Sequence, residues 1–252
     1  MYTRIKTPEE IENMRRSGKI LASVHKKLIE HVAVGVSTKK LADIAHKEIK
    51  KLGGEPAFLG YGAPTPFPDV ICISVNDEVV HGIPSEDKIL KDGDIVSLDL
   101  GVSYNGMITD SAVSVICGIA NPKIEEFLIH TKKSLYAGLK AVKNGCLVGD
   151  ISNAIQKYLE RYGYGIVRDL VGHGVGHEVH EDPNIPNFGN KKSGPKLVSG
   201  MTLAIEPMTT LGNYGVHIKS DGWTVATNDG SLAAHFEHTI LVTDKGCEIL
   251  TQ

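Results

Sequence analysis

The sequence lacks an excess of basic residues, a long apolar run and any closely spaced pair of cysteines. Its 252 residues include 27 lysines and arginines against 30 acidic residues, which gives a net charge of −3. This balance argues against nucleic acid or an anionic membrane surface as a partner, because both require a basic face. No apolar stretch approaches the length that spans a bilayer, and the polar start MYTRIKTPEE is unlike a signal peptide. We therefore expect a soluble, cytoplasmic protein.

The four cysteines are scattered along the chain and form no C-x-x-C pair. Scattered cysteines are typical of reduced, buried thiols rather than of a disulfide framework. The sequence also has no low-complexity linker, and its length allows one large domain with a sizeable core. The cysteines are Cys72, Cys117, Cys146 and Cys247.

Apolar periodicity predicts two helices near the start of the chain. The first runs from about residue 8 to residue 30. Ser37 or Thr38 then caps a second helix, which ends at Gly53 and Gly54. The strand-like segments that follow are ICISV, DIVSLDLG and MITDSAVSVI.

The same pattern recurs 110 residues later. Gly145 matches Gly35 and Gly163 matches Gly53, with an amphipathic stretch between each pair. A further predicted helix, over about residues 122–143, precedes this second copy. The strand-like segments after it are MTLAIEPMTT, WTVAT and FEHTILVT.

Two helix pairs, each followed by strands, indicate an internal duplication. We predict one α+β domain over residues 1–252, with pseudo-symmetric halves of about 1–118 and 119–252. The alternative is that amphipathic helices resemble one another by chance. If the duplication holds, the functional site lies between the halves, where both can contribute side chains.

The segment GHGVGHEVHEDP, residues 172–183, contains three histidines. His177, Glu178 and His180 read H-E-x-H, one residue too short to place both imidazoles on one face of a zinc-binding helix. Alternate glycines also disfavour a helix. We therefore predict an extended segment, in which His173 and His180 act from opposite sides.

Asp99 and Asp110 lie in apolar strands on either side of Asn105-Gly106, a strong signal for a tight hairpin. Counting outward from this turn places Asp99 opposite Ala112, with Asp110 as its diagonal neighbour on the same face, roughly 7 Å away or less. Two like charges on a half-buried face repel each other unless a cation lies between them. The alternative is that one or both side chains point into solvent.

Glu206 and Glu237 are also embedded in strand-like segments, where glutamate is disfavoured. Together with Asp99, Asp110 and His173 they form a set of four carboxylates and one imidazole. Such a set suits two hard or borderline divalent ions that share bridging carboxylates. A pair of ions activates a water between them and polarises a carbonyl group.

These residues carry a resemblance to a known family. The chain resembles the type I methionine aminopeptidases, which have the pita-bread fold, over essentially its whole length. The resemblance implies an α+β fold in which two pseudo-symmetric halves contribute an antiparallel sheet and flanking helices. The matching stretches are SVNDEVVHGIP (74–84), DIVSLDLG with Asp110, VGHGVGHEVHEDPNIPNFG (171–189), LAIEPM (203–208) and GWTVATNDGSLAAHFEHTI (222–240).

The resemblance implies two divalent metal ions per chain, with Asp110 and Glu237 bridging them. Mixed sites of this kind accept cobalt, manganese, iron or zinc, and the sequence does not choose among these metals. The implied ligands are Asp99, Asp110, His173, Glu206 and Glu237.

The resemblance also implies the catalytic residues. Glu206 is expected to accept a proton from the metal-bound hydroxide that attacks the substrate and to deliver it to the leaving amine. His180 is expected to stabilise the oxyanion and His81 to hold the scissile amide. The alternative for His81 is a turn histidine before Gly82, and His177 is expected to be surface or structural.

The implied activity is removal of N-terminal methionine from nascent polypeptides, with a preference for a small second residue. Met1 of this chain, followed by the bulky Tyr2, is accordingly expected to stay in place. Phe58 and Val179 depart from familiar members, and the alternative for Phe58 and Tyr61 is ordinary core packing. The residues implied to line the methionine pocket are Phe58, Tyr61, Phe67, Cys72, Val179 and Trp223.

Rival functions share the scaffold, because the same fold hosts prolidases, Xaa-Pro aminopeptidases and creatinases. The stretches that begin at Glu206 and Glu237, EPM and EHTI, resemble the methionine branch. A binding protein that has lost its metals is a second rival, which the five intact ligand positions disfavour. We expect a cytoplasmic monomer that binds neither membranes nor, by itself, nucleic acid, and contact with the ribosome stays open.

Overall fold

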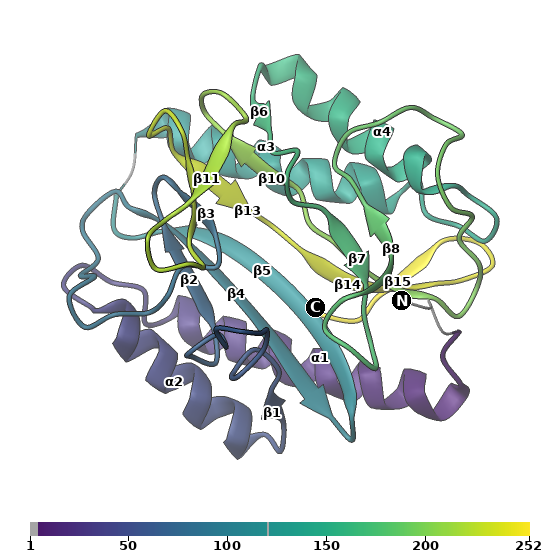
Figure 1. Ribbon diagram of the computed structural model, residues 1–252, viewed down its shortest axis with the longest axis horizontal. Helices are drawn as coiled ribbons and strands as arrows, with labels where there is room; N and C mark the ends of the chain where they lie inside the picture. Colours follow the sequence, from purple (N-terminus) through teal and green to yellow (C-terminus); the bar gives the residue numbers. More distant parts are fainter. Residues whose placement is uncertain (1–4, 120) are drawn as a thin grey trace.

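The computed structural model describes residues 5–119 and 121–252, which form helices and antiparallel sheets (Figure 1). Met1 and Tyr2, the subject of one prediction, lie outside the described residues. The helices are α1 (Pro8–Ile29), α2 (Thr38–Lys51), α3 (Pro122–Leu139) and α4 (Val148–Leu159), followed by a 3-10 turn over Glu160–Tyr162. In the described part of the chain no helix combines the length and apolar character that a membrane span requires.

Fifteen strands of the described residues form four small sheets, so the predicted α+β class is confirmed. In Figure 1 the strands lie between the pair α1 and α2 and the pair α3 and α4. The strands are β1 (Glu55–Pro56), β2 (Cys72–Val75), β3 (Glu78–Val80), β4 (Ile95–Tyr104), β5 (Met107–Ile116), β6 (Gly165–Ile166), β7 (Gly172–Gly174), β8 (Glu181–Ile185), β9 (Thr202–Ile205), β10 (Met208–Thr210), β11 (Val216–Ile218), β12 (Val225–Thr227), β13 (Ala233–His235), β14 (His238–Val242) and β15 (Cys247–Ile249).

The helices begin where their caps predict. Thr7 and Glu10 form a capping box at the start of α1, and the Ser37 side chain accepts a hydrogen bond at the start of α2. The apolar faces of α1 and α2 pack on β4 and its neighbours, whereas α3 and α4 pack on the strands of the second half. α3 ends at Leu139, earlier than predicted, and the chain then turns towards α4.

The two helix pairs have the same local structure at the spacing of the sequence repeat. Gly35 and Gly145 have φ angles of 86° and 85°, and Gly53 and Gly163 have φ angles of 83° and 69°. Glycine adopts this left-handed conformation without the steric cost that other residues incur. The matching glycines in the sequence therefore correspond to matching turns in the structure.

The β4–β5 hairpin has the predicted register. Asn105 and Gly106, both with positive φ, form the turn, and ten residue pairs follow outward from it. Asp99 lies opposite Ala112, and Asp110 lies opposite Gly101. The placement of the two aspartates as diagonal neighbours is thus confirmed.

The halves meet where β5 runs beside the residues that lead into β14. The Glu237 backbone N–H donates to the Ala112 carbonyl at 2.9 Å, and the Ser111 hydroxyl donates to the Glu237 carbonyl at 2.8 Å. The Asp110 N–H donates to the Thr239 hydroxyl at 2.8 Å. These bonds fix Asp110 and Glu237 next to each other across the junction.

Candidate metal centre

Three buried side chains from different elements converge at the junction of the halves. Asp110 comes from β5, His173 from β7 and Glu237 from the segment between β13 and β14. One donor atom from each lies within 4.8 Å of the others. A carboxylate, an imidazole and a second carboxylate at this spacing can bind one divalent cation.

Asp99 and Glu206 border the same site. Glu206 Oε1 lies 3.3 Å from His173 Nε2, and Asp99 neighbours Asp110 across the β4–β5 ladder. All five residues named as ligands in the sequence line one cavity of about 110 Å³. We call it the acidic cavity; its polar wall is Asp99, Asp110, His173, Glu206 and Glu237.

Burial and mutual repulsion make the carboxylates of the acidic cavity hard to ionise. Burial is the main cause that raises the pKa values of Asp99, Glu206 and Glu237 well above their ordinary range, and the nearby charge of Asp110 adds to it. Burial also raises the pKa of Asp110. A cation among them would remove both penalties.

Three oxygens of these acids are buried with no hydrogen-bond partner among the described residues. They are Asp99 Oδ1, Asp110 Oδ1 and Glu237 Oε1. A buried oxygen without a donor is costly, so it marks the place of an acceptor for something the protein itself does not supply. The donor set therefore fits divalent metal ions.

The tautomer of His173 also suits a ligand. Its Nδ1 lies 2.9 Å from the Gly174 carbonyl, which can only accept, so Nδ1 carries the hydrogen. Burial lowers the pKa of His173 to about 3, and the ring is neutral at pH 7. Its Nε2 then presents a lone pair towards Glu206 and the cavity.

His180 lies beside His173, so the prediction that the two act from opposite sides is wrong. Their ring centroids are 4.3 Å apart. β7 ends at Gly174, and the chain bends between residues 176 and 180 instead of continuing extended. The bend turns the His180 ring back to the cavity that His173 faces.

The sequence left two alternatives for His81, a turn residue before Gly82 or a residue of the site, and the structure combines them. It has a φ angle of 58°, as in a turn, and its ring also lines the acidic cavity. Burial lowers the pKa of His81 to about 4 and also lowers the pKa of His180. His180 Nδ1 is hydrogen-bonded to the Tyr61 hydroxyl at 2.5 Å.

An apolar wall adjoins the acidic residues. The six residues named as the methionine pocket all line the cavity, and four of them, Phe58, Phe67, Cys72 and Val179, form one buried cluster. Phe58 thus contributes to core packing and to the wall at once. The wall also contains residues that the sequence argument missed, which are Val80, Leu170, Val171 and Met208.

His235 is the most notable residue that the sequence argument missed. Its Nε2 lies 3.5 Å from Glu206 Oε2 and 3.9 Å from Glu237 Oε2. The side chain is buried, and neither ring nitrogen has a hydrogen-bond partner in the part of the chain that the structure describes. The available signal was its spacing of two residues from Glu237 in an extended segment, which predicts a shared face.

His177 is structural, as expected. Its Nε2 lies 2.8 Å from Glu10 Oε1, and its backbone N–H donates to Glu181 Oε1 at 2.7 Å. Glu181 also accepts from Lys6 Nζ at 2.5 Å, and both side chains are almost fully buried. These contacts fasten the bend that carries His180 to the N-terminal segment.

Comparison with known proteins shows the family of this chain. The sequence pattern of metallopeptidase family M24 matches residues 12–244 of this chain. The chain is 47% identical to the methionine aminopeptidase of Clostridium acetobutylicum, over 98% of each chain. It is 45% identical to that of Aquifex aeolicus, over 100% of each chain.

Solved structures give the same result for the fold. The crystal structure of methionine aminopeptidase from Thermotoga maritima superposes with a TM-score of 0.97, at 45% identity and 100% coverage of both chains. The prolidase from Pyrococcus furiosus reaches a TM-score of 0.79 at 26% identity, over 99% of this chain and 66% of that one. The predicted pita-bread fold is confirmed, including its kinship with a proline-handling peptidase.

Proposed function

The chain belongs to metallopeptidase family M24 and, within it, to the methionine aminopeptidases, and from this membership we propose how its own residues carry out the reaction. It is a metal-dependent methionyl aminopeptidase, which hydrolyses the bond after an N-terminal methionine. The proposal concerns the number of metal ions, the residues that hold them, and the groups that bind the substrate and move protons.

One observation carries the proposal. Buried oxygens of Asp99, Asp110 and Glu237 have no partner among the residues that the structure describes, and they face one small cavity. Four carboxylates with raised pKa values surround a volume that close packing of a protein interior would otherwise fill with apolar side chains. Bound cations would compensate the negative charge of these carboxylates and so account for their burial.

We assign the five polar residues of the acidic cavity as ligands of two divalent ions. Asp110 and Glu237, joined through backbone hydrogen bonds at the junction of the halves, would bridge the ions. Bound there, the ions supply Lewis acidity, which polarises the scissile carbonyl and lowers the pKa of water. Manganese, iron, cobalt and zinc all suit this mixture of oxygen and nitrogen donors.

Glu206 is the residue that moves the proton. Its Oε1 lies 3.3 Å from His173 Nε2 on the wall of the acidic cavity, so its carboxylate would be within reach of the attacking water. It would take a proton from this water and pass it to the leaving amine.

His180 and His81 bind the reacting amide. The Tyr61 hydroxyl lies 2.5 Å from His180 Nδ1; with this hydroxyl as the donor, His180 Nε2 would carry a hydrogen that can be donated to the substrate oxygen. A donor aimed at a developing oxyanion contributes about 10²–10³ in rate. Because burial lowers the pKa of His81 to about 4, the ring is neutral and can accept or donate at the scissile amide without adding charge.

The apolar wall would bind the methionine side chain. Phe67 and Trp223 contact each other edge to face, with ring centroids 5.3 Å apart, and Cys72 lies next to Asp99 across the β2–β4 ladder. An unbranched thioether fits such a wall of aromatic and small apolar groups. A confined cavity also favours a small second residue.

The setting of the reaction follows from the substrate. We propose a single catalytic domain over residues 1–252, with halves of about 1–118 and 119–252, that acts as a monomer on nascent chains in the cytoplasm. Contact with the ribosome stays a prediction.

The decisive experiment combines metal analysis with substrate choice. The full chain is stripped with a chelator, reloaded with manganese, iron, cobalt or zinc in turn, and assayed with Met-Ala-Ser and with an Ala-Pro peptide. We expect cleavage of Met-Ala-Ser alone and a stoichiometry of about two ions per chain. Asp99→Ala should lower the stoichiometry and abolish turnover. Cleavage of only the proline peptide, or full activity of metal-loaded Asp99→Ala, would overturn the proposal.

A further inference from the structure

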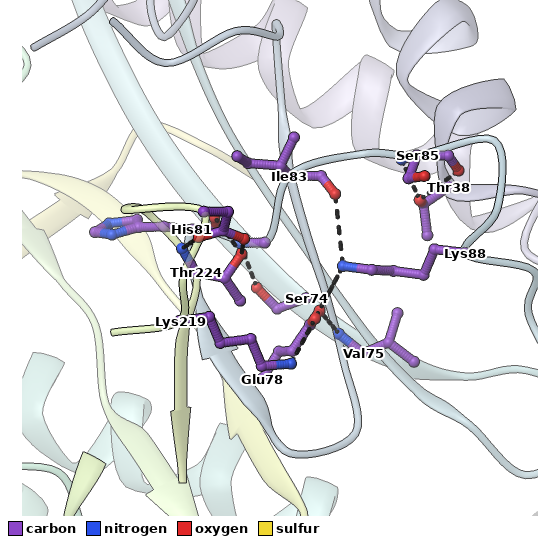
Figure 2. A network of polar contacts seen from close by, with 12 residues as sticks. Thr38, Ser74, Val75, Glu78, His81, Ile83, Ser85, Lys88, Lys219 and Thr224 are labelled. Atoms are coloured by element: carbon purple, nitrogen blue, oxygen red, sulfur yellow. Dashed lines mark hydrogen bonds and ion pairs between the residues drawn. The ribbon is translucent and has the colours of Figure 1, made fainter. Parts of the chain in front are cut away.

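A buried carboxylate outside the metal centre joins segments of both halves. Glu78, on β3, accepts hydrogen bonds from Lys88 Nζ at 2.9 and 2.8 Å and from Lys219 Nζ at 3.1 Å. The Val75 N–H donates a fourth bond to it at 2.9 Å. Figure 2 shows both ammonium groups pointing at this carboxylate, Lys88 from the N-terminal half and Lys219 from the C-terminal half. The side chain of Glu78 is only 8% exposed.

The Lys88 side of this cluster holds the loop that begins at His81. Lys88 Nζ also reaches the Ile83 carbonyl at 3.5 Å (Figure 2). The Gly82 N–H donates to the Ser74 hydroxyl at 3.1 Å. A Cβ on Gly82 would lie 2.4 Å from a backbone oxygen, so the loop packs directly against β2. His81 thus enters the acidic cavity from a rigid segment.

The Lys219 side of the cluster holds the turn between β11 and β12. The Lys219 N–H donates to the Thr224 carbonyl at 2.8 Å, and Asp221 accepts from the Trp223 and Thr224 N–H groups at 2.9 and 2.8 Å. Lys219 and Trp223 therefore belong to one tight turn. A displacement of Lys219 would move Trp223 with it.

Trp223 closes the apolar wall against the other half. Its ring meets His81 edge to face, with centroids 6.1 Å apart, and its Nε1–H donates to the Thr65 carbonyl at 3.1 Å. Gly62 allows this approach, since a Cβ there would lie 2.8 Å from the indole. The tryptophan is thus the point where the C-terminal turn completes a pocket built mainly by the N-terminal half.

We propose that the ion pair between Glu78 and Lys219 sets the position of Trp223 in the methionine pocket and so determines how tightly the substrate side chain binds. Lys88 alone neutralises the buried carboxylate, so Lys219 is not needed to compensate charge. What Lys219 adds is a fixed link between the turn and β3. The inference rests on the proposed function of the pocket, and Lys219 is a positioning residue that touches no reacting atom.

Trp223 is the single tryptophan of the chain, so its fluorescence reports on this turn alone. In Lys219→Met, with Glu78 still paired to Lys88, we expect acrylamide quenching of Trp223 to rise about twofold, in the metal-free and in the metal-loaded chain. The KM for a Met-Ala-Ser peptide should rise about threefold, while kcat stays within about twofold of its original value. Lys219→Arg should restore both values.

The matched control is Lys27→Met, which breaks an exposed ion pair with Glu30 at the C-terminal end of α1. It should change neither the quenching nor KM. Thermal unfolding of each variant separates a local shift of the turn from a loss of folded protein. If Lys219→Met folds and leaves both the quenching and KM unchanged, the inference is overturned. Since quenching is measured without substrate, it tests the turn even if the chain cleaved no methionine peptide, an outcome that would instead overturn the proposed function.

Discussion

At the scale of single residues, the acids of the acidic cavity lower the stability of the metal-free chain and provide a binding site for metal ions. Each of its four acids is buried, and each has a raised pKa that reports the cost of ionising it there. Such a cost is borne at functional sites and compensated elsewhere in the fold. Removing one charge should therefore help the metal-free protein and harm the metal-loaded one.

Asp110→Asn tests these opposite effects on the stability of the metal-free chain and on metal binding. The amide keeps the shape of the side chain and removes a carboxyl group whose pKa burial raises to about 7, so above that pH the metal-free variant should gain about 1–2 kcal/mol in free energy of unfolding. It should also lose a ligand, so that metal no longer raises its melting temperature and turnover falls below detection. Calorimetry with and without metal measures both effects. Asp43→Asn, at an exposed position, is the control; a metal-free Asp110→Asn less stable than the parent chain would contradict the prediction.

His235→Phe tests the contact that the sequence argument missed. Phenylalanine keeps the ring and removes the nitrogen that lies within 3.5 Å of Glu206 and 3.9 Å of Glu237. Loss of a group that orients metal ligands typically lowers metal affinity about 10- to 100-fold. We expect that loss in a calorimetric metal titration, and His235→Gln, which retains a donor, should recover part of it. Equal affinity in all three proteins would show that His235 only fills space.

At the scale of elements, the sequence predicted what local rules determine and missed what tertiary contacts determine. The Asn105-Gly106 turn sets the register of ten residue pairs, so the positions of Asp99 and Asp110 followed from counting. The bend after Gly174 has no such rule. It depends on Glu181 and Lys6, which are 175 residues apart. Because nothing in GHGVGHEVHEDP encodes that distant lysine, the placement of His180 was predicted wrongly.

Lys6→Met tests how far that bend depends on the buried pair. The change leaves the Glu181 carboxylate buried without its cation, which typically costs about 3–5 kcal/mol. The bend that carries His180 should loosen, so kcat should fall by at least about tenfold. Urea unfolding and steady-state kinetics measure the two effects. The double variant Lys6→Met with Glu181→Gln should recover part of the stability.

Arg15→Met is the matched control for Lys6→Met. It also removes a cation from a long-range pair, with Glu248 at 2.8 Å, but both side chains are more than a third exposed. Such pairs contribute about 0–1 kcal/mol. If Lys6→Met costs no more than Arg15→Met, the buried pair does not hold the bend.

At the scale of the whole molecule, the site lies where residues 1–118 meet residues 119–252, the two predicted halves. Each half contributes strands to the junction, with Asp110 from one and Glu237 from the other. The recurrence of glycines predicted matching turns, but it could not predict which face of each half meets the other. That arrangement depends on the hydrogen bonds between β5 and the residues of β14 and just before it, which no periodicity encodes.

The balance of buried acids and buried histidines predicts how the stability of the metal-free chain varies with pH. Above pH 6.5, the ordinary pKa of histidine, the histidines are neutral in both folded and unfolded chains. Above that pH the four acids determine how the stability changes with pH. Because their folded pKa values are raised, the stability they contribute is lost as the pH rises through those values. Below pH 6.5 the opposite holds for His25 and His235, whose pKa values burial lowers to about 4 and about 3, so stability is lost as the pH falls.

The metal-free chain should therefore be most stable at about pH 6–7 and lose roughly 3–6 °C in melting temperature by about pH 8.5. Bound metal keeps the acids ionised and paired, so the loss on the alkaline side should vanish. At a metal concentration about 100 times the dissociation constant, the free energy of unfolding should rise by about 3 kcal/mol. Differential scanning calorimetry across this pH range, with chelator and with metal, measures both curves. A metal-free chain whose melting temperature rises from about pH 7 to about pH 8.5 would show that its buried acids ionise without penalty, and that cations are not what compensates them.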